Sequence, residues 1–268
     1  MRLLFLGDVV GTTGCLKITN NLRDQINLNK IDFVIVNGEN AAEEGVGLTK
    51  EICENFFECG VNVITTGNHV WDKKDIMNFI DKEKRLLRPK NLFEPAPGEG
   101  FQIYKTSKNI KVGVLNLMGN VFMKKCDDVF ETSKKFIEKY RLKDDYDILV
   151  VDFHGEITSE KNAIGHFFDG KATLVIGTHT HIPTNDARIL KDGTAYQTDA
   201  GMCGDYDSVI GMDKENSLNR FRKKESVKHF PAIGDATLSG VIVDCDIKTG
   251  LAKNIKSYIF GGQLNNNL

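Results

Sequence analysis

The segment Ala172-Thr173-Leu174-Val175-Ile176-Gly177-Thr178-His179-Thr180-His181 joins a strand pattern to two histidines. Residues 172–176 form a short apolar, β-branched run that is typical of a buried strand, and Gly177 permits a sharp exit from it. In an extended segment, side chains two residues apart project to the same side, so His179 and His181 reach one site. Neutral imidazole is a good ligand for first-row metals. The segment therefore predicts a metal site at a strand end; the alternative is two polar loop histidines.

Polar side chains also follow the other apolar runs of the chain. Residues 3–6, 33–36, 61–66 and 147–153 predict buried strands. The groups after these runs are, in order, Asp8, Glu39 with Asn40, Asn68 with His69, and His154. Ligands of open α/β sheets bind outside the carboxyl ends of the strands, so we expect these groups to converge with His179 and His181.

Each of these groups has a simpler interpretation when it is taken alone. Asp8 fits a helix cap, Asn40 and Asn68 fit turns, and His154 fits a hydrogen-bonded core histidine. The recurrence of Asp, Glu, Asn and His at five strand exits is what favours one shared site.

The order of the predicted elements indicates the fold class. Helices are predicted from the loop 9–14 to about residue 29, at 50–59 between the cap Thr49 and Gly60, at 73–80 with Asp72 as the cap, and at 132–140 and 159–167. A strand pair is predicted at 101–104 and 111–117. The last third reads mainly as strands, at 187–190, 194–197, 238–246 and 253–259. An α/β layered fold finished by antiparallel strands follows from this order.

We expect one domain over residues 1–268. Within it, residues 201–232 are Gly-rich and then basic, which favours either a lid or partner surface or simply a solvated helix. The last residues, 265–268, are expected to fray.

Composition excludes several classes of protein. The chain has 268 residues, of which 41% are hydrophobic and 27% charged, and its net charge is −2; this is ordinary for a soluble globular protein and offers no basic surface for nucleic acid or membrane. The six scattered cysteines contain no C-x-x-C pair, which argues against a structural zinc site and fits a reducing compartment. The apolar run before Gly7 is too short for a signal peptide or a membrane span. We therefore expect a cytoplasmic protein with no membrane association.

The predicted ligands suit two metal ions. Histidines and oxygen donors supply two half-shells, and a carboxylate such as Glu39 can bridge them. Two ions roughly 3.5–4 Å apart clamp a phosphate and lower the pKa of a bridging water. Mixed nitrogen and oxygen ligation fits Mn, Fe, Zn or Co.

In this order, Asp8, Gly38-Glu39, Gly67-Asn68-His69, His154 and Gly177–His181 resemble the motifs of the calcineurin-like metallophosphoesterases. That pattern is Asp-x-His, Gly-Asp, Gly-Asn-His, a lone His and Gly-His-x-His. Val10 stands where the pattern has its first His, and Glu39 replaces the bridging Asp, with Asn40 beside it. These departures are similar to the bacterial YmdB-like phosphodiesterases. The resemblance to this branch runs along nearly the whole chain, in segments such as Gly7–Gly11, Asn37–Ala42, Gly67–Lys74 and Gly211–Asp213.

The resemblance implies a layered α-β-β-α sandwich of two mixed sheets flanked by helices. It implies hydrolysis of cyclic nucleotides, with 2′,3′-cyclic forms favoured, by in-line attack of a metal-bridging hydroxide. Matched positions assign one ion to Asp8, Glu39, Asn40 and His181, with Asn40 in the place left open by Val10, and the other to Glu39, Asn68, His154 and His179. Iron or manganese is favoured, with zinc, cobalt or magnesium as alternatives. His69 is left free of metal as the catalytic residue, aimed at the phosphate and the leaving oxygen.

Other functions remain open at this point. The same ions would serve a phosphomonoesterase or a nuclease. A non-catalytic regulator that senses a nucleotide or holds RNA or an RNA-decay partner is favoured by Val10 and opposed by the intact Asn68-His69. Trp71 is weighed as a base-stacking or a packing residue, and Arg88 or Lys90 as a phosphate contact. We also expect a homo-oligomer.

Overall fold

The computed structural model describes residues 1–222 and 228–264, so the predicted frayed end at 265–268 lies outside the described residues. The strands form two mixed sheets of seven and six strands. The strand bounds are β1 Arg2–Leu6, β2 Asp8–Val9, β3 Phe33–Asn37, β4 Val63–Thr65, β5 Phe101–Lys105, β6 Lys111–Met118, β7 Ile148–His154, β8 Leu174–Thr178, β9 Arg188–Ile189, β10 Ala195–Gln197, β11 Met202–Asp205, β12 Ala236–Cys245 and β13 Ala252–Phe260.

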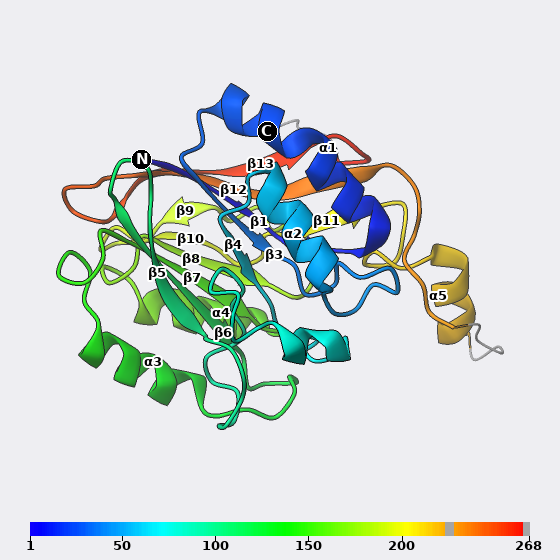
Figure 1. Cartoon of the computed structure of the whole chain (residues 1–268), viewed down its shortest axis with the longest axis horizontal. Coiled ribbons are helices and arrows are strands. Elements are labelled where there is room, and N and C mark those ends of the chain that lie inside the picture. The colour runs from blue at the N-terminus through cyan, green and yellow to red at the C-terminus, as the bar shows by residue number, and fades with distance from the viewer. Residues whose placement is uncertain (223–227, 265–268) are drawn as a thin grey trace.

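Helices cover the outer face of each sheet, which confirms the predicted α-β-β-α sandwich. The helix bounds are α1 Gly11–Asn29, α2 Lys50–Cys59, the 3₁₀ helix η1 Lys74–Asn78, α3 Val129–Lys139, α4 Thr158–Phe167 and α5 Lys214–Phe221. In Figure 1, α1 and α2 lie over the seven-stranded sheet, α3 and α4 lie on the opposite side of the molecule, and α5 projects from one end.

Alternating side chains of the central strands build the core. Leu3 and Phe5 of β1 point into the cluster between the two sheets, whereas Leu4 and Leu6 pack under α1 and α2. Both faces of these strands are therefore buried, which explains why their sequences are continuous apolar runs.

The parallel pairing of the strands determines where the groups at their carboxyl ends lie. The seven-stranded sheet has the order β2-β11-β12-β1-β3-β4, with β13 on β12, and the other sheet has the order β5-β6-β7-β8-β10-β9. Strands β1, β3 and β4 are parallel to one another, as are β6, β7, β8 and β10. The carboxyl ends of each set therefore meet at one edge.

Local signals at helix ends were mostly confirmed. The Thr49 hydroxyl accepts the Ile52 N–H at the start of α2, and Gly60 ends that helix with φ 113°. The prediction that Asp72 caps the next helix is wrong, because η1 begins at Lys74 without a side-chain cap. Asp72 pairs with His69 instead.

Residues 201–232 are partly built into the sheet. Strand β11 pairs with β2 and β12, so the start of this segment belongs to the sandwich, and α5 follows it. The lid or partner surface stays a prediction, and residues 223–227 within it lie outside the described residues. In the part of the chain that the structure describes, no helix is both long and apolar enough to span a membrane.

Candidate metal centre and active site

Three predicted ligands converge on the ring of a fourth, His154, which is the last residue of β7. Its Nε2 lies 2.9 Å from Glu39 Oε1, 3.0 Å from Asn68 Oδ1 and 3.1 Å from His179 Nδ1. Glu39, His154 and His179 each offer a ligand atom within 4.8 Å of the others. These are the four groups that the family resemblance assigns to one ion.

The remaining predicted ligands, Asp8, Asn40 and His181, are linked to this group by short contacts. Asn40 Nδ2 is 3.4 Å from Glu39 Oε1 and 3.0 Å from His181 Nε2. Asp8 Oδ2 accepts the backbone N–H of His179 at 3.0 Å, and Asp8 Oδ1 is 3.7 Å from His154 Nδ1. The fold thus brings all seven predicted ligands together, with Glu39 between the two groups.

Two buried oxygen atoms of this cluster show that cations fit the site. Asp8 Oδ1 and Asn40 Oδ1 are buried, and neither has a hydrogen-bond partner among the described residues. A buried polar atom without a partner costs free energy, and a bound cation would satisfy both. The carboxylate, amide and imidazole donors are those that first-row divalent ions accept. The residues present therefore fit metal ions.

Gly67 makes the close approach possible. A Cβ atom there would lie 2.3 Å from Glu39 Oε2 and 2.2 Å from His154 Cδ2. Only glycine leaves this space, which explains why it precedes Asn68 and His69.

The pKa values of three groups in the cluster are strongly shifted. Burial lowers the pKa of His179, and the charge on His154 lowers it further, to about 3. Burial opposes ionisation of Glu39, but the charge and hydrogen bond of His154 outweigh it and bring the Glu39 pKa to about 2. Burial likewise opposes the charge on His154, yet Glu39 and Asp8 raise the His154 pKa to about 9. Without metal these shifts favour a proton on His154, which cation binding would release.

The two histidines of the opening segment reach the site by an unexpected backbone conformation. His179 has φ 100° and His181 has φ 67°, so the extended geometry predicted for them is wrong although both rings do lie in the cluster. Gly177 is not a turn either, because it lies inside β8, where a Cβ would be 1.8 Å from Thr198 O. Left-handed non-glycine residues cost about 1–3 kcal/mol each and gather at functional sites.

A buried ion pair holds this strained loop. Asp199 Oδ2 accepts the Thr180 hydroxyl at 2.7 Å and its backbone N–H at 3.2 Å. The same oxygen accepts Lys161 Nζ at 2.6 Å, and both side chains are almost completely buried. Thr180 stands between His179 and His181, so Asp199 fixes both.

A second network orients His154. Thr178 Oγ1 donates to Asp152 Oδ1 at 2.7 Å, so it accepts from His154 Nδ1, 2.9 Å away. With its proton on Nδ1, the neutral ring presents the Nε2 lone pair to the cluster. Burial raises the pKa of Asp152 to about 7, although hydrogen bonds from Thr65 and Thr178 oppose the rise.

His69 lies at the edge of this cluster. Its Nδ1 is 2.7 Å from Asp72 Oδ2, and its backbone N–H donates to Glu39 Oε2 at 3.2 Å. His69 lines the same cavity, of about 450 Å³, as Glu39, His179 and His181.

Sequence reasoning missed Asp199, Asp152 and Glu156, whose Oε2 lies 2.9 Å from His179 Nε2. Asp199 follows β10 at a strand exit, so the rule that located the other groups would also have found it. Asp152 is a carboxylate inside an apolar strand, which is itself a signal.

The three residues considered as substrate contacts, Trp71, Arg88 and Lys90, do not line the cavity. Trp71 packs against the core cluster under α1 and α2, as the packing alternative states. The buried guanidinium of Arg88 is occupied by backbone carbonyls and by Glu94. Among the described residues, none of Trp71, Arg88 and Lys90 lines the cavity.

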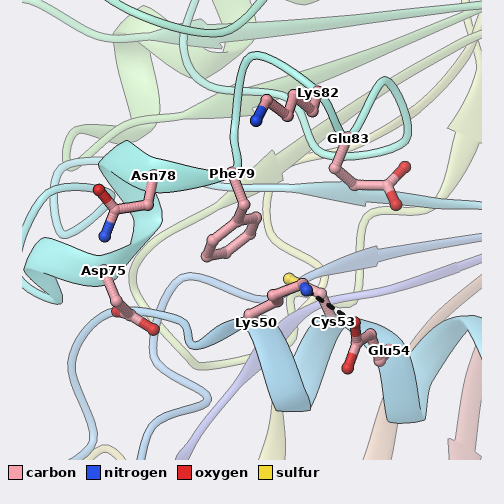
Figure 2. A pocket seen from close by; sticks show the side chains of 8 residues that line it. All are labelled: Lys50, Cys53, Glu54, Asp75, Asn78, Phe79, Lys82 and Glu83. Carbon is pink, nitrogen blue, oxygen red and sulfur yellow. Dashed lines mark ion pairs between the residues drawn. The ribbon is translucent and has the colours of Figure 1, made fainter.

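A cavity of about 480 Å³ lies elsewhere, between α2 and η1. Figure 2 shows Phe79 facing Lys50 and Cys53 across it, with charged side chains around the rim. Lys50 pairs with Glu54 at 3.4 Å. None of the predicted site residues lines it, so we place the chemistry in the other cavity.

The two mixed sheets between helices, with His, Asn and carboxylate groups at the strand ends, define a protein of the metallophosphoesterase fold. Solved structures agree. The sulfate thiohydrolase SoxB of Thermus thermophilus superposes on 93% of this chain and 43% of its own with TM-score 0.53 at 12% identity, which shows the fold alone.

The family model described as YmdB-like protein matches residues 4–258, and the chain belongs to that family. It is 43% identical, over 96% of each chain, to a Bacillus subtilis protein named 2′,3′-cyclic-nucleotide 2′-phosphodiesterase. A structure from Mycoplasma pneumoniae described as a novel phosphatase superposes with TM-score 0.89 at 37% identity, over 97% of this chain and 93% of that one. A hypothetical protein of Thermus thermophilus gives TM-score 0.89 at 36% identity, over 97% and 99%.

Proposed function

We propose that this protein is a metal-dependent phosphodiesterase that hydrolyses cyclic nucleotides, with 2′,3′-cyclic forms favoured. The observation that carries the proposal is the position of Glu39, which contacts His154 of one ligand group and Asn40 of the other. The Bacillus relative's name supports the substrate class.

The same geometry supports two metal ions per chain. Asp8, Asn40 and His181 would hold one ion, Asn68, His154 and His179 the other, and Glu39 both. We favour iron or manganese, with zinc, cobalt or magnesium as alternatives. The donors are nitrogen and oxygen, which suit these ions, and no cysteine among the described residues lines the cavity.

The chemistry divides between the ions and the chain. Bound cations would supply a water of lowered pKa and neutralise phosphate charge. Water attacks phosphorus after losing a proton to solvent, the bond from phosphorus to the ribose oxygen breaks, and His69 gives that oxygen a proton. The Asp72 carboxylate accepts from His69 Nδ1–H, so Nε2 is the nitrogen left to carry and transfer the proton.

The test is a turnover assay on a panel of 2′,3′-cyclic, 3′,5′-cyclic and linear phosphodiesters and a phosphomonoester, with metal analysis of the same sample. The proposal requires that a cyclic nucleotide be hydrolysed fastest by protein that contains metal. Preference for the monoester or for RNA would establish the phosphomonoesterase or nuclease instead, and no turnover by fully metal-loaded protein would establish the non-catalytic regulator. The cytoplasmic location, an RNA-decay partner and a homo-oligomer stay predictions from the sequence.

A further inference from the structure

The cavity that holds the candidate ligands extends beyond them. Its volume is about 450 Å³, which is within the range of small-molecule sites. Glu39, His69, His179 and His181 form its polar end. Its lining also includes Val46, Ile210, Met212 and His229, none of which is a predicted ligand, and we call these four residues the distal wall.

The distal wall is attached to the metal end. The backbone carbonyl of Ile210 accepts a hydrogen bond from His181 Nδ1 at 2.7 Å. Met212 is bridged to Val209 and Pro231, and a Cβ at Gly45 would lie 2.9 Å from Met212 Cε. The wall is thus held at a fixed place relative to a predicted ligand.

The side chains of the wall are left for a ligand to cover. Ile210 is 51% exposed although it borders the cavity, and it has φ 49°, an uncommon conformation for a β-branched residue. An apolar side chain presented in this way next to a polar centre is typical of a binding site with an apolar part.

His229 adds one hydrogen-bonding group to this surface. Its Nε2 lies 3.2 Å from Ser217 Oγ, and Ser217 is buried in α5. Partial burial and the charge of Arg220 lower the pKa of His229. A neutral ring at pH 7 suits the edge of an uncharged heterocycle better than a phosphate.

From the shape and chemistry of this cavity we infer that the distal wall is the subsite for the nucleobase, with Met212 and Ile210 against its face and His229 at its edge. This rests on the proposed function, which puts the phosphate at the metal end. A phosphate at the metal ligands leaves the distal wall uncovered. A nucleotide covers both, with its phosphate at the ligands and its base at the wall. The inference gives Ile210, Met212 and His229 a role in substrate selection.

The experiment compares two cyclic phosphodiesters: adenosine 2′,3′-cyclic phosphate, which carries a base, and glycerol 1,2-cyclic phosphate, which carries neither the base nor the ribose ring. The variants are Met212→Ala, His229→Ala and Ile210→Asn. The last one is safe for folding, because Asn accepts a left-handed conformation better than Ile does. Met77→Ala and His166→Ala are matched controls, since both side chains are exposed and lie outside the cavity.

We expect kcat/KM for the adenosine ester to fall about tenfold in each wall variant, mainly through KM. The glycerol ester, the metal content and both controls should be unchanged. Binding of adenosine 3′-monophosphate to the metal-loaded protein, measured by calorimetry against glycerol phosphate, should weaken by a similar factor for the nucleotide alone.

Equal losses for both esters, or no loss for either, would overturn the subsite while the phosphodiesterase activity stands. Parent protein that hydrolyses neither ester would overturn the proposed function, and base-dependent binding would still decide the subsite.

Discussion

Replacing Glu39 with Gln tests the group on which the site depends. The change keeps the shape of the side chain and removes its charge. Glu39 is fully buried and contacts His154 and Asn40 and the backbone N–H of His69. We expect metal affinity and turnover to fall by more than about 100-fold, since even groups behind the ligands contribute about 10–100-fold to metal affinity.

The effect on folding should depend on pH. In metal-free protein burial opposes ionisation of Glu39, but the charge and hydrogen bond of His154 lower its pKa from 4.5 to about 2, so the ionised carboxylate contributes to stability. Because this pKa is lowered, that stability is present above pH 4.5 and is lost as the pH falls toward 2. The His154 pKa is raised from 6.5 to about 9, so its share is present below pH 6.5 and is lost as the pH rises through 9. The cost of Glu39→Gln should therefore be largest between these limits and smaller above pH 9.

Three measurements on parent and variant check this prediction: urea unfolding after chelator treatment at about pH 6 and at about pH 9.5, metal content, and turnover. Glu39→Asp is the matched control, because it keeps the charge and shortens the reach. If Glu39→Gln turns over like the parent at equal metal loading, Glu39 does not bridge two ions.

Further predictions separate the other roles. His179→Ala should lose metal affinity, and added metal should partly restore its turnover. His69→Ala should keep its metal and lose about 10²–10⁴-fold in turnover of a ribose ester, with a smaller loss for a nitrophenyl ester. Loss of metal in His69→Ala would make His69 a ligand. Because the pKa of His154 is raised to about 9, metal affinity should rise about tenfold for each unit by which the pH increases toward 9. Calorimetry in buffers of different ionisation enthalpy measures the proton released on metal binding, and finding no release would contradict this prediction. Asp199→Asn should weaken metal binding by about 10–100-fold, and an unchanged metal affinity would refute the positioning role of Asp199. The same change leaves the Lys161 charge buried without its partner, which costs about 3–5 kcal/mol. Adding Lys161→Met should therefore recover stability.

The sequence predicted the strands and the groups at their ends, because buried parallel strands are long apolar runs and polar residues at their ends stand out. It could not predict that His179 and His181 are left-handed. That conformation depends on Asp199 and on the Ile210 carbonyl, which come from distant parts of the chain.

Short elements with non-local partners were also missed. Strand β2 has two residues and exists only because β11 pairs with it, and neither segment has a strand pattern. The distal wall was missed for the same reason: Val46, Met212 and His229 are brought together by the fold alone.

The most direct test of the account is a titration of metal-stripped protein with Mn²⁺, followed by hydrolysis of a 2′,3′-cyclic nucleotide. We predict no turnover in the stripped protein and a rise to a plateau at two equivalents per chain. Full turnover in the presence of chelator, or a plateau at one equivalent, would contradict a site in which Glu39 joins two ions.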